Sequence, residues 1–260
     1  MTYDTLQLEI AGEVATITLN RPDKRNAIST QMIEDLLVAL EKIETGAVRV
    51  AIITGSGKAF SAGMDLDALR SLAGQSFEQN LADSRLFANL LYRIHSLSKP
   101  IIAAVNGPAI AGGCGIATLC DFTLAVPEAK FGYTEVKIGF IPAVVSVFLR
   151  RQVGDKIARD LLISGRVIDT AEAHRLGLIT EIVPAANLAA RAQEFAGILL
   201  SASPTSIART KRLLLGYDEA ALKAELEIAI RENAAIRSTT DFREGLSSFL
   251  EKRAPKWTGH

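Results

Sequence analysis

Apolar residues recur along the chain with two periods, one typical of β-strands and one typical of α-helices. Short alternating runs at 6–10 and 14–19 flank the turn Ala11-Gly12-Glu13, and this pattern predicts a β-hairpin. A helical period begins at Ser29 or Thr30, where a hydroxyl side chain suits the start of a helix. Further apolar runs predict buried strands at 48–54, 101–105 and 122–126.

Strands and helices alternate through the first two thirds of the chain. Residues 66–99 have the pattern of an irregular polar region, at 66–84, followed by a helix that ends before Pro100. Another helix is predicted at 112–119. Alternating strands and helices predict an α/β fold in which helices cover a parallel sheet.

The last part of the chain lacks the strand period. From about residue 185, apolar stripes among charged residues predict helices at 187–200, 204–215, 218–235 and 240–252. We therefore expect a core at 1–184 and a helical oligomerisation region at 185–260. The helical region packs either on its own core or on a neighbouring subunit, and an oligomer is favoured.

The composition limits the classes of function. Hydrophobic residues make up 48% of the 260 residues, as in a globular domain, and 29 basic residues balance 29 acidic ones. This balance gives no reason to expect nucleic acid as a partner, and no apolar run is long enough to predict a membrane span. Without a leader pattern, a cytoplasmic protein is expected. Cys114 and Cys120 fit small core residues, and no spacing of ligands predicts a metal site.

Two glycine-bearing turns carry the clearest sign of chemistry. One contains Gly63 and the other is Ala111-Gly112-Gly113-Cys114-Gly115, and each follows an apolar run. Glycine tolerates positive φ and lets a ligand approach the main chain, so two such turns can direct two N–H groups at one point. A developing oxyanion needs such a pair of donors. The pattern predicts carbonyl or thioester chemistry.

Familiar alternatives fit the sequence poorly. A phosphate-binding loop at Gly55-Ser56-Gly57-Lys58 fails because Ala59 stands where serine or threonine would bind magnesium. A dinucleotide-binding turn after 101–105 would require a third glycine where Thr118 stands. The sequence also lacks the Gly-x-Ser-x-Gly motif that would support a serine nucleophile.

Glu135 is the best candidate for an acid or base. It lies between apolar residues in the segment 131–140, where partial desolvation would raise the pKa of its carboxyl toward a value useful for proton transfer. Taken alone, the segment fits a surface glutamate at the start of a helix better.

A set of short motifs extends over nearly the whole chain. The motifs are Arg21-Pro22-Asp23-Lys24-Arg25-Asn26-Ala27, Lys58-Ala59-Phe60-Ser61-Ala62-Gly63-Met64-Asp65-Leu66, Asn106-Gly107-Pro108-Ala109-Ile110-Ala111-Gly112-Gly113, Cys120-Asp121, Phe131-Gly132 with Glu135, Ala171-Glu172-Ala173 with Gly177-Leu178, and Glu251-Lys252-Arg253. In this order and spacing they resemble the crotonase superfamily, which includes the enoyl-CoA hydratases and isomerases.

The resemblance implies a crotonase-like spiral of ββα turns with a C-terminal helical trimerisation region. It implies a homotrimer or a dimer of trimers. The substrate would be an acyl-CoA thioester of fatty acid metabolism, with coenzyme A as part of the substrate and no separate cofactor.

The resemblance also assigns residues. It places the oxyanion hole on the N–H groups of Met64 and Gly112, with Glu135 as the acid/base. Lys58 would contact the CoA nucleotide, and Lys252 would reach it from a neighbouring tail. Asp67 stands where the family often has a further lysine. The remaining substrate contacts would come from Ala62, Asp65, Leu66, Gly113, Gly115 and Ala143.

Gly115 departs from the two-glutamate hydratases, which carry a first glutamate at this position. A single glutamate suits a double-bond isomerase, because one base can remove a proton and return it at another carbon. The segment 135–145 is nevertheless similar to branches called hydratases, including methylglutaconyl-CoA-type enzymes, and the N–H of Ala143 could hold a water. Hydratase and isomerase both stay open. The dehalogenase branch is disfavoured, because Ala88 and Ala143 stand at its histidine and aspartate positions.

A third possibility is an acyl-CoA-binding protein that lost turnover together with the glutamate at position 115. The presence of Glu135 speaks against this non-catalytic alternative.

Overall fold

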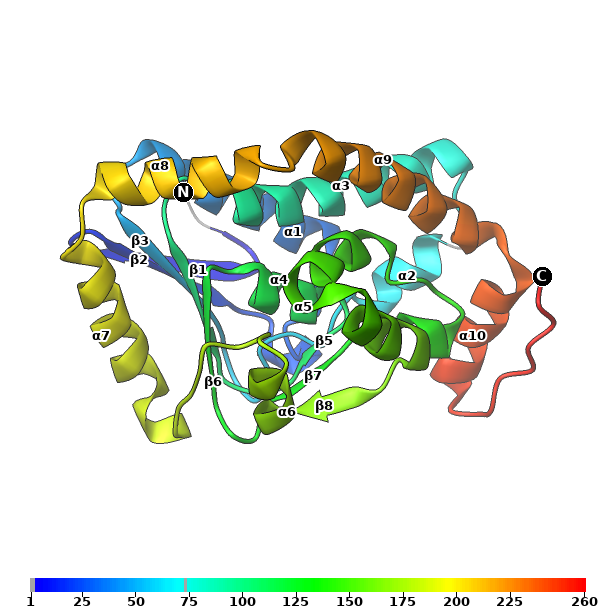
Figure 1. Cartoon of the computed structure of the whole chain (residues 1–260). Helices are drawn as coiled ribbons and strands as arrows, with labels where there is room; N and C mark the ends of the chain where they lie inside the picture. Colours follow the sequence, from blue (N-terminus) through cyan, green and yellow to red (C-terminus); the bar gives the residue numbers. More distant parts are fainter. Residues whose placement is uncertain (1–2, 73) are drawn as a thin grey trace.

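The computed structural model describes residues 3–72 and 74–260, in which strands and helices alternate as far as β9 and helices follow it (Figure 1). The strands are β1 Leu6–Ala11, β2 Val14–Leu19, β3 Val50–Gly55, β4 Ile101–Val105, β5 Ala109–Ile110, β6 Phe122–Ala125, β7 Lys130–Gly132, β8 Val167–Asp169 and β9 Glu181–Ile182. The α-helices are α1 Thr30–Thr45, α2 Leu66–Leu72, α3 Phe77–Ser96, α4 Gly112–Leu119, α5 Ala143–Ser164, α6 Thr170–Arg175, α7 Leu188–Leu200, α8 Pro204–Gly216, α9 Glu219–Ala235 and α10 Thr240–Glu251.

The larger sheet has the strand order β1-β2-β3-β4-β6-β9. Strands β1 and β2 form the predicted antiparallel hairpin, with Leu6 opposite Leu19, and the other neighbours in this sheet are parallel. Every residue of β4 is buried, as expected for a strand covered on both faces. The predicted strands at 48–54, 101–105 and 122–126 therefore correspond to β3, β4 and β6, which are adjacent in this sheet.

A second layer runs beside the larger sheet. It contains the sheet β5-β7-β8 and is extended by parallel bridges that pair Ile28 with Met64 and Ser61 with Ala109. Each turn of the chain thus gives a strand to the large sheet, a short extended segment to the second layer, and then a helix. This arrangement is the predicted spiral of ββα turns.

Helices cover the sheet on two sides. Helix α7 packs against β3, β4 and β6, while α4 contacts β4 and β6 and lies beside α3 and α5 (Figure 1). Helix α3 packs between α1 and α9. The predicted start of α1 is confirmed, because the side chain of Ser29 accepts a hydrogen bond from the N–H of Met32.

The prediction of an irregular region at 66–84 was wrong. Helix α2 begins directly after Asp65, whose side chain accepts a hydrogen bond from the N–H of Asp67. Helix α3 begins at Phe77, where Ser76 and Gln79 form a reciprocal capping box. The polar residues that suggested a loop belong to capped helix ends.

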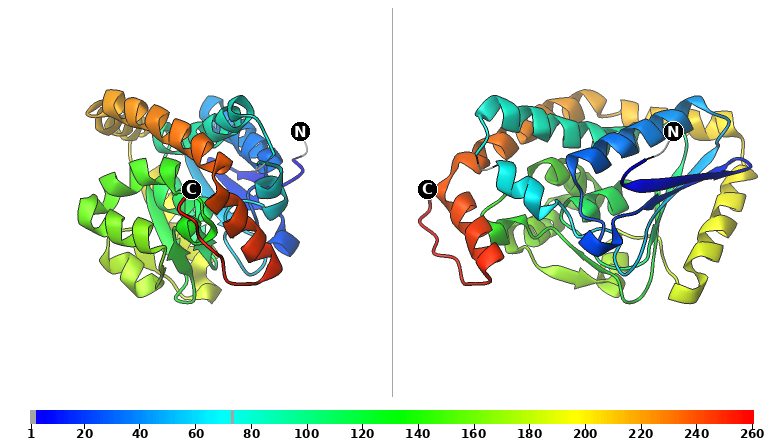
Figure 2. Two further views of the ribbon diagram at one scale, coloured as in Figure 1. Left: turned by 90° about the vertical axis from the view of Figure 1, so that its right-hand side faces the viewer. Right: turned by 180° about the vertical axis from the view of Figure 1, so that it is seen from behind.

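The predicted C-terminal helices are α7 to α10, and each of them contacts elements from the first part of the same chain. Helix α9 runs alongside α3 (Figure 2) and also contacts α5. Helix α10 packs against the 3₁₀ turn η2, Glu135–Ile138. A small apolar cluster fixes this contact, in which the rings of Phe140 and Phe242 lie 5.4 Å apart. The tail therefore covers the segment that carries Glu135.

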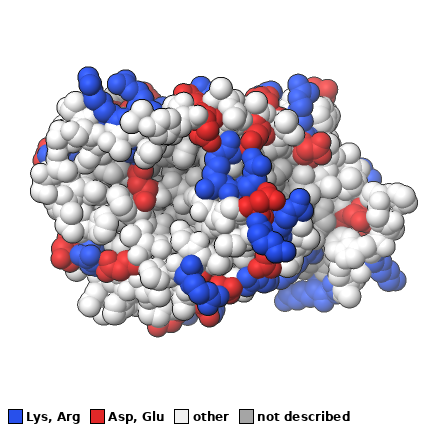
Figure 3. Space-filling view, viewed as in Figure 1, with Lys and Arg blue, Asp and Glu red and all other residues white. Residues whose placement is uncertain are grey.

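One face of the molecule shows the balanced composition directly. Figure 3 shows basic and acidic side chains interspersed over the face seen there. Within the described residues, no helix combines the length and hydrophobicity required to cross a membrane. Cys114 and Cys120 are both free thiols in the core, as predicted.

Candidate active site

The first glycine turn presents the main chain of Met64. Gly63 has φ +87°, which a residue with a side chain rarely adopts. The neighbours of Met64 complete the bridge to Ile28: Ile28 N–H donates to the Gly63 carbonyl and Asp65 N–H donates to the Ile28 carbonyl. The alternation of an extended strand therefore turns the N–H of Met64 away from Ile28.

The second turn places the N–H of Gly112 at the start of α4. Here the positive φ belongs to Ala111, at +51°, and none of the three following glycines has a positive φ. The prediction that glycine conformation shapes this turn was therefore wrong. Gly112 and Gly113 are needed for close approach, because a Cβ would lie 2.9 Å from Cζ of Phe87 and 2.7 Å from Cβ of Ser61, respectively.

The two turns lie directly against each other. A Cβ on Gly63 would come within 2.9 Å of the Ile110 carbonyl oxygen and 3.0 Å of the Ala111 Cβ. The N–H of Ile110 donates to the Ser61 carbonyl over 2.9 Å, which joins the segments before the turns. Within residues 3–72 and 74–260, neither the Met64 N–H nor the Gly112 N–H has a hydrogen-bond acceptor. Two free donors thus stand close together, as an oxyanion requires.

Glu135 is buried beside these donors. It opens the turn η2, its residue is 8% exposed, and its Oε2 has no hydrogen-bond partner among the described residues. Burial raises the pKa of the Glu135 carboxyl to about 7, although a bond from its own backbone N–H acts in the opposite direction. A carboxyl with this pKa can accept and return a proton near neutral pH.

One cavity of about 140 Å³ brings the candidate groups together. This volume is close to the roughly 150 Å³ of an apolar cavity that holds benzene. Of the residues predicted from the sequence, Ala62, Met64, Gly112, Glu135 and Ala143 line it. Glu135 is the only carboxylate in its lining, within the part of the chain that the structure describes.

Gly115 lies behind this cavity rather than in its wall. A Cβ at this position would be 2.7 Å from Cγ1 of Val145, and Val145 itself lines the cavity. The φ of Gly115 is not positive, so the close contact with Val145 explains the glycine. The space that a side chain at 115 would need is taken by an aliphatic group.

The structure does not bring the other predicted residues to the cavity lining. Asp65 is buried, pairs with Arg21 at 2.8 Å and caps α2. Gly113 packs on Ser61. Lys58 and Lys252 are exposed, and Lys252 directly follows α10 of the same chain. The side chain of Leu66 lies outside the described part of the structure.

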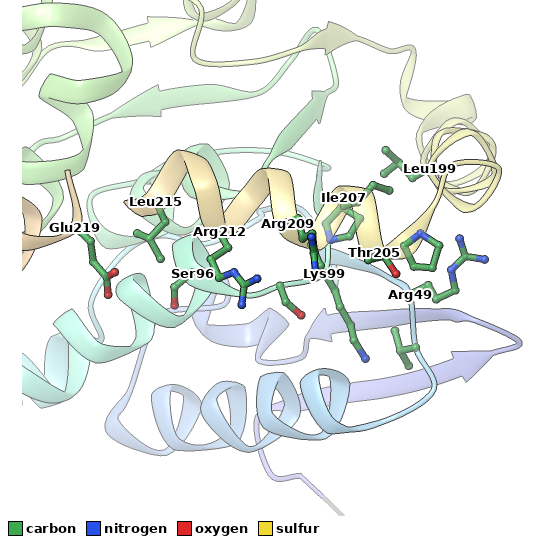
Figure 4. A pocket seen from close by; sticks show the side chains of 15 residues that line it. Arg49, Ser96, Lys99, Leu199, Thr205, Ile207, Arg209, Arg212, Leu215 and Glu219 are labelled. Carbon is green, nitrogen blue, oxygen red and sulfur yellow. The ribbon is translucent and has the colours of Figure 1, made fainter. Parts of the chain in front are cut away.

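A second cavity, of about 660 Å³, lies between α8 and the turn after α3 (Figure 4). Basic residues surround this cavity, but two of them already donate hydrogen bonds to backbone carbonyls. Lys99 Nζ donates to the carbonyls of Ile43 and Gly46, and Arg49 donates to those of Leu200 and Ala202. Among the described residues, its lining includes none of the predicted site residues, and we assign it no catalytic role.

Two buried polar residues in the lining of the cavity that contains Glu135 were not predicted from the sequence. Arg237 is 1% exposed and Asn233 is also buried, and both come from the C-terminal region. Each is a single polar residue in a helical stretch rich in charges. The sequence therefore contained no signal that they face inward.

Comparisons with known proteins identify the family of this chain. The family described as Enoyl-CoA hydratase/isomerase matches residues 9–260. A Thermus thermophilus protein that carries the name enoyl-CoA hydratase is 43% identical over 247 residues, which cover 95% of this chain and 98% of that protein. The 2,3-dehydroadipyl-CoA hydratase of Escherichia coli (strain K12) is 34% identical over 248 residues, 95% of each chain.

A solved structure gives the same result for the fold. The carnitinyl-CoA hydratase from Mycobacterium avium superposes with a TM-score of 0.88 at 34% identity and covers 100% of both chains. The chain therefore belongs to the enoyl-CoA hydratase/isomerase family and has the crotonase fold. It is an enzyme of a family that acts on acyl-CoA thioesters.

Proposed function

We propose that this enzyme moves a proton at the α-carbon of an enoyl-CoA thioester through an enolate, with Glu135 as the acid/base. The observation that carries the proposal is the buried carboxyl of Glu135 in the cavity that Met64 and Gly112 also line, because its Oε2 has no hydrogen-bond partner among the described residues. The two free N–H groups would bind the thioester oxygen as it gains charge. Loss of one such donor typically lowers the rate by about 10²–10³.

Hydration of the enoyl double bond is the first candidate reaction, in line with the names of the relatives. The water oxygen bonds to the β-carbon while its proton passes to Glu135, and the π electrons move to the thioester oxygen. Glu135 then returns the proton to the α-carbon as the enolate collapses. The main-chain N–H of Ala143, in the first turn of α5, is available to hold that water.

Double-bond isomerisation is the second candidate, because Glu135 is the one carboxylate in the described cavity lining. A single carboxylate would remove a proton from the α-carbon of a 3-enoyl-CoA and return it at the γ-carbon. This reaction requires no second acid and no water. Val145 occupies the space that a side chain at position 115 would need, which leaves no room for a second carboxylate and supports the same alternative.

Purified enzyme supplied with crotonyl-CoA and, separately, with a 3-enoyl-CoA distinguishes these reactions. Hydration predicts a 3-hydroxyacyl-CoA from crotonyl-CoA, and isomerisation predicts a conjugated 2-enoyl-CoA from the 3-enoyl substrate. Chromatography with mass detection separates the products. Turnover of neither substrate above the rate of an enzyme-free blank would overturn the proposal.

We further propose that coenzyme A enters only as part of the substrate and that the active enzyme is a trimer or a dimer of trimers. Helix α8 supports assembly, because its residues are all at least partly exposed in the single chain. Leu213 is 57% exposed, Leu214 61% and the adjoining Tyr217 74%. Light scattering measures the mass directly, and a monomer at micromolar concentration would contradict the assembly.

Lys58, together with Lys252 from a neighbouring tail, remains our proposed contact to the CoA nucleotide, since both are exposed cations. Replacing each by methionine should weaken CoA binding without abolishing proton transfer. Calorimetric titration with CoA measures the change.

A further inference from the structure

A buried cation lies in the wall of the proposed acyl cavity. Arg237, in the turn after α9, is 1% exposed and forms an ion pair with Asp83 of α3 at 2.8 Å. Its Nη atoms also donate to Asn80 Oδ1, Ser84 Oγ and Asn233 Oδ1, over 3.2, 3.1 and 2.8 Å. The guanidinium is therefore held rigidly, and Asp83 compensates its charge.

Hydrogen-bond donors remain unused at this place. The Nε–H of Arg237 is buried without an acceptor among the residues that the structure describes. Asn233 must turn its Oδ1 toward Arg237, because a guanidinium only donates hydrogen bonds. The Oδ1 also accepts from Ser84 Oγ, so the amide is fixed in one orientation. Its Nδ2 donates no hydrogen bond within residues 3–72 and 74–260 and, unlike Nε of Arg237, is not a fully buried atom.

These donors lie in surroundings that are otherwise largely apolar. Most of the cavity wall is apolar, with Ile28, Leu69, Phe87 and Val144 among the lining residues. The buried Nε–H of Arg237 destabilises the protein as long as it has no acceptor, and a hydrogen bond from a charged group is among the stronger ones. The ring of Phe140 lies 5.7 Å from the guanidinium carbon, which adds apolar surface next to the cation. An oxygen atom of a ligand would remove the deficit.

We propose that Arg237 and Asn233 select a short acyl group that carries a hydrogen-bond-accepting oxygen at its far end, as a carboxylate or a carbonyl. The inference rests on the proposed function, in which this cavity receives the acyl group of an enoyl-CoA. A volume of about 140 Å³ has room for a few carbons beyond the thioester. Arg237 and Asn233 are thus specificity-determining residues and take no part in the proton transfer.

The first test uses three trans-2-enoyl-CoA thioesters of equal length that end in an isopropyl group, a methyl ketone and a carboxylate. The three ends have the same branched shape, so they differ in oxygen content and charge. We expect kcat/KM to be about tenfold or more higher for an oxygen-bearing end than for isopropyl. If both oxygen-bearing ends are preferred, Arg237 and Asn233 select any hydrogen-bond-accepting oxygen. If only the carboxylate is preferred, they select an anion. An isopropyl end that reacts as well as both would overturn the inference.

The second test separates selection from a purely structural role. Asn233→Asp keeps the Oδ1 acceptor for Arg237 and Ser84 but removes the Nδ2 donors. It should lower the preference for the oxygen-bearing end about tenfold and leave the isopropyl substrate nearly unchanged. The double variant Arg237→Met/Asp83→Asn removes the ion pair and should abolish the preference.

The matched control is Arg85→Met/Glu227→Gln, which removes an exposed ion pair of 2.7 Å between α3 and α9, the helices that carry Asp83 and Asn233. It should leave the preference unchanged. If the control and the Asn233→Asp variant change the preference equally, helix packing is responsible and the inference fails.

A failed proposed function would be seen separately, as absence of turnover with all three substrates. Calorimetric binding of the three saturated acyl-CoA analogues then still tests selection. Tighter binding of an oxygen-bearing end supports it, and equal binding contradicts it.

Discussion

Gly115 and Val145 compete for one space: a Cβ on Gly115 would lie 2.7 Å from Cγ1 of Val145. Both residues are buried, on α4 and α5, so a side chain added at position 115 and the side chain of Val145 would have no way to move into solvent. The absence of a carboxylate at position 115 and the presence of valine at position 145 therefore depend on each other. A carboxylate cannot be added without making room for it.

This relationship predicts a difference between a single and a double variant. Gly115→Glu alone should be strongly destabilised, because the new side chain meets a well-packed aliphatic group. Gly115→Glu/Val145→Ala should fold and increase crotonyl-CoA hydration relative to double-bond isomerisation, compared with Val145→Ala alone. Two carboxyls in one site raise the pKa of one of them and would supply an acid together with a base. An unchanged ratio of the two activities in the folded double variant would refute this reasoning.

Replacement of Glu135 by glutamine should remove the acid/base and preserve the shape of the site. We expect turnover to fall by about 10²–10⁴ while CoA affinity stays within the error of calorimetry. In the unmodified enzyme, turnover that requires the carboxylate should rise with pH around the pKa of about 7, and this rise should be absent in the variant. Steady-state rates between pH 5 and 9 provide the measurement. Turnover near that of the unmodified enzyme would exclude Glu135 from the mechanism.

Burial of Glu135 also predicts a cost in stability. The pKa rises from 4.5 in the unfolded chain to about 7 in the folded protein, so between these values the folded state binds the proton more tightly. As the pH rises from 4.5 to 7, ionisation of Glu135 therefore lowers the free energy of unfolding by about 3 kcal/mol. Above pH 7 the contribution of this group is constant.

Glutamine cannot ionise, so Glu135→Gln should be more stable than the unmodified enzyme at pH 8 and nearly equal to it at pH 4.5. Urea denaturation at the two pH values measures the difference. The exposed Glu128 provides a control, because Glu128→Gln should change stability equally at both. A gain of the same size at both values for Glu135→Gln would mean that ionisation is not its cause.

Much of the fold could be predicted from local patterns. The hairpin, the buried run at 101–105 and the helix after Ser29 occur where the periodicity placed them. These elements were predictable because each buries an apolar face that is visible over five to fifteen residues. The 66–84 region was not, since capping by Asp65 and Ser76 depends on geometry rather than periodicity.

The site was predictable only in part, for a related reason. Met64, Gly112 and Glu135 belong to short motifs, and all three line the cavity. Arg237 lies a hundred residues from Glu135, and its burial depends on the packing of α9 against α3. The strained φ of Ala111 likewise follows from the strand before it, because its N–H donates to the carbonyl of Gly132. Such features arise from tertiary contacts that leave no local pattern.

The last prediction concerns the helical tail. A chain that ends at Pro184 would lose α9, and with it the apolar residues Leu222, Leu226 and Ile230 that complete the core beside α3 and α5. It would also lose α10, whose Phe249 lines the cavity. Exposed faces of this size favour aggregation, so the shortened chain should be aggregated or unable to bind CoA.

A milder change tests the same dependence within a folded protein. Leu222 is fully buried, and Leu222→Ala should cost about 2–5 kcal/mol. Leu213 lies on the exposed face of α8, and Leu213→Ala should have little effect on the stability of the single chain. Thermal unfolding compares the two variants, and gel filtration with CoA titration assesses the shortened chain. A monodisperse chain of 184 residues with full CoA affinity would show that the tail supports neither the core nor the site.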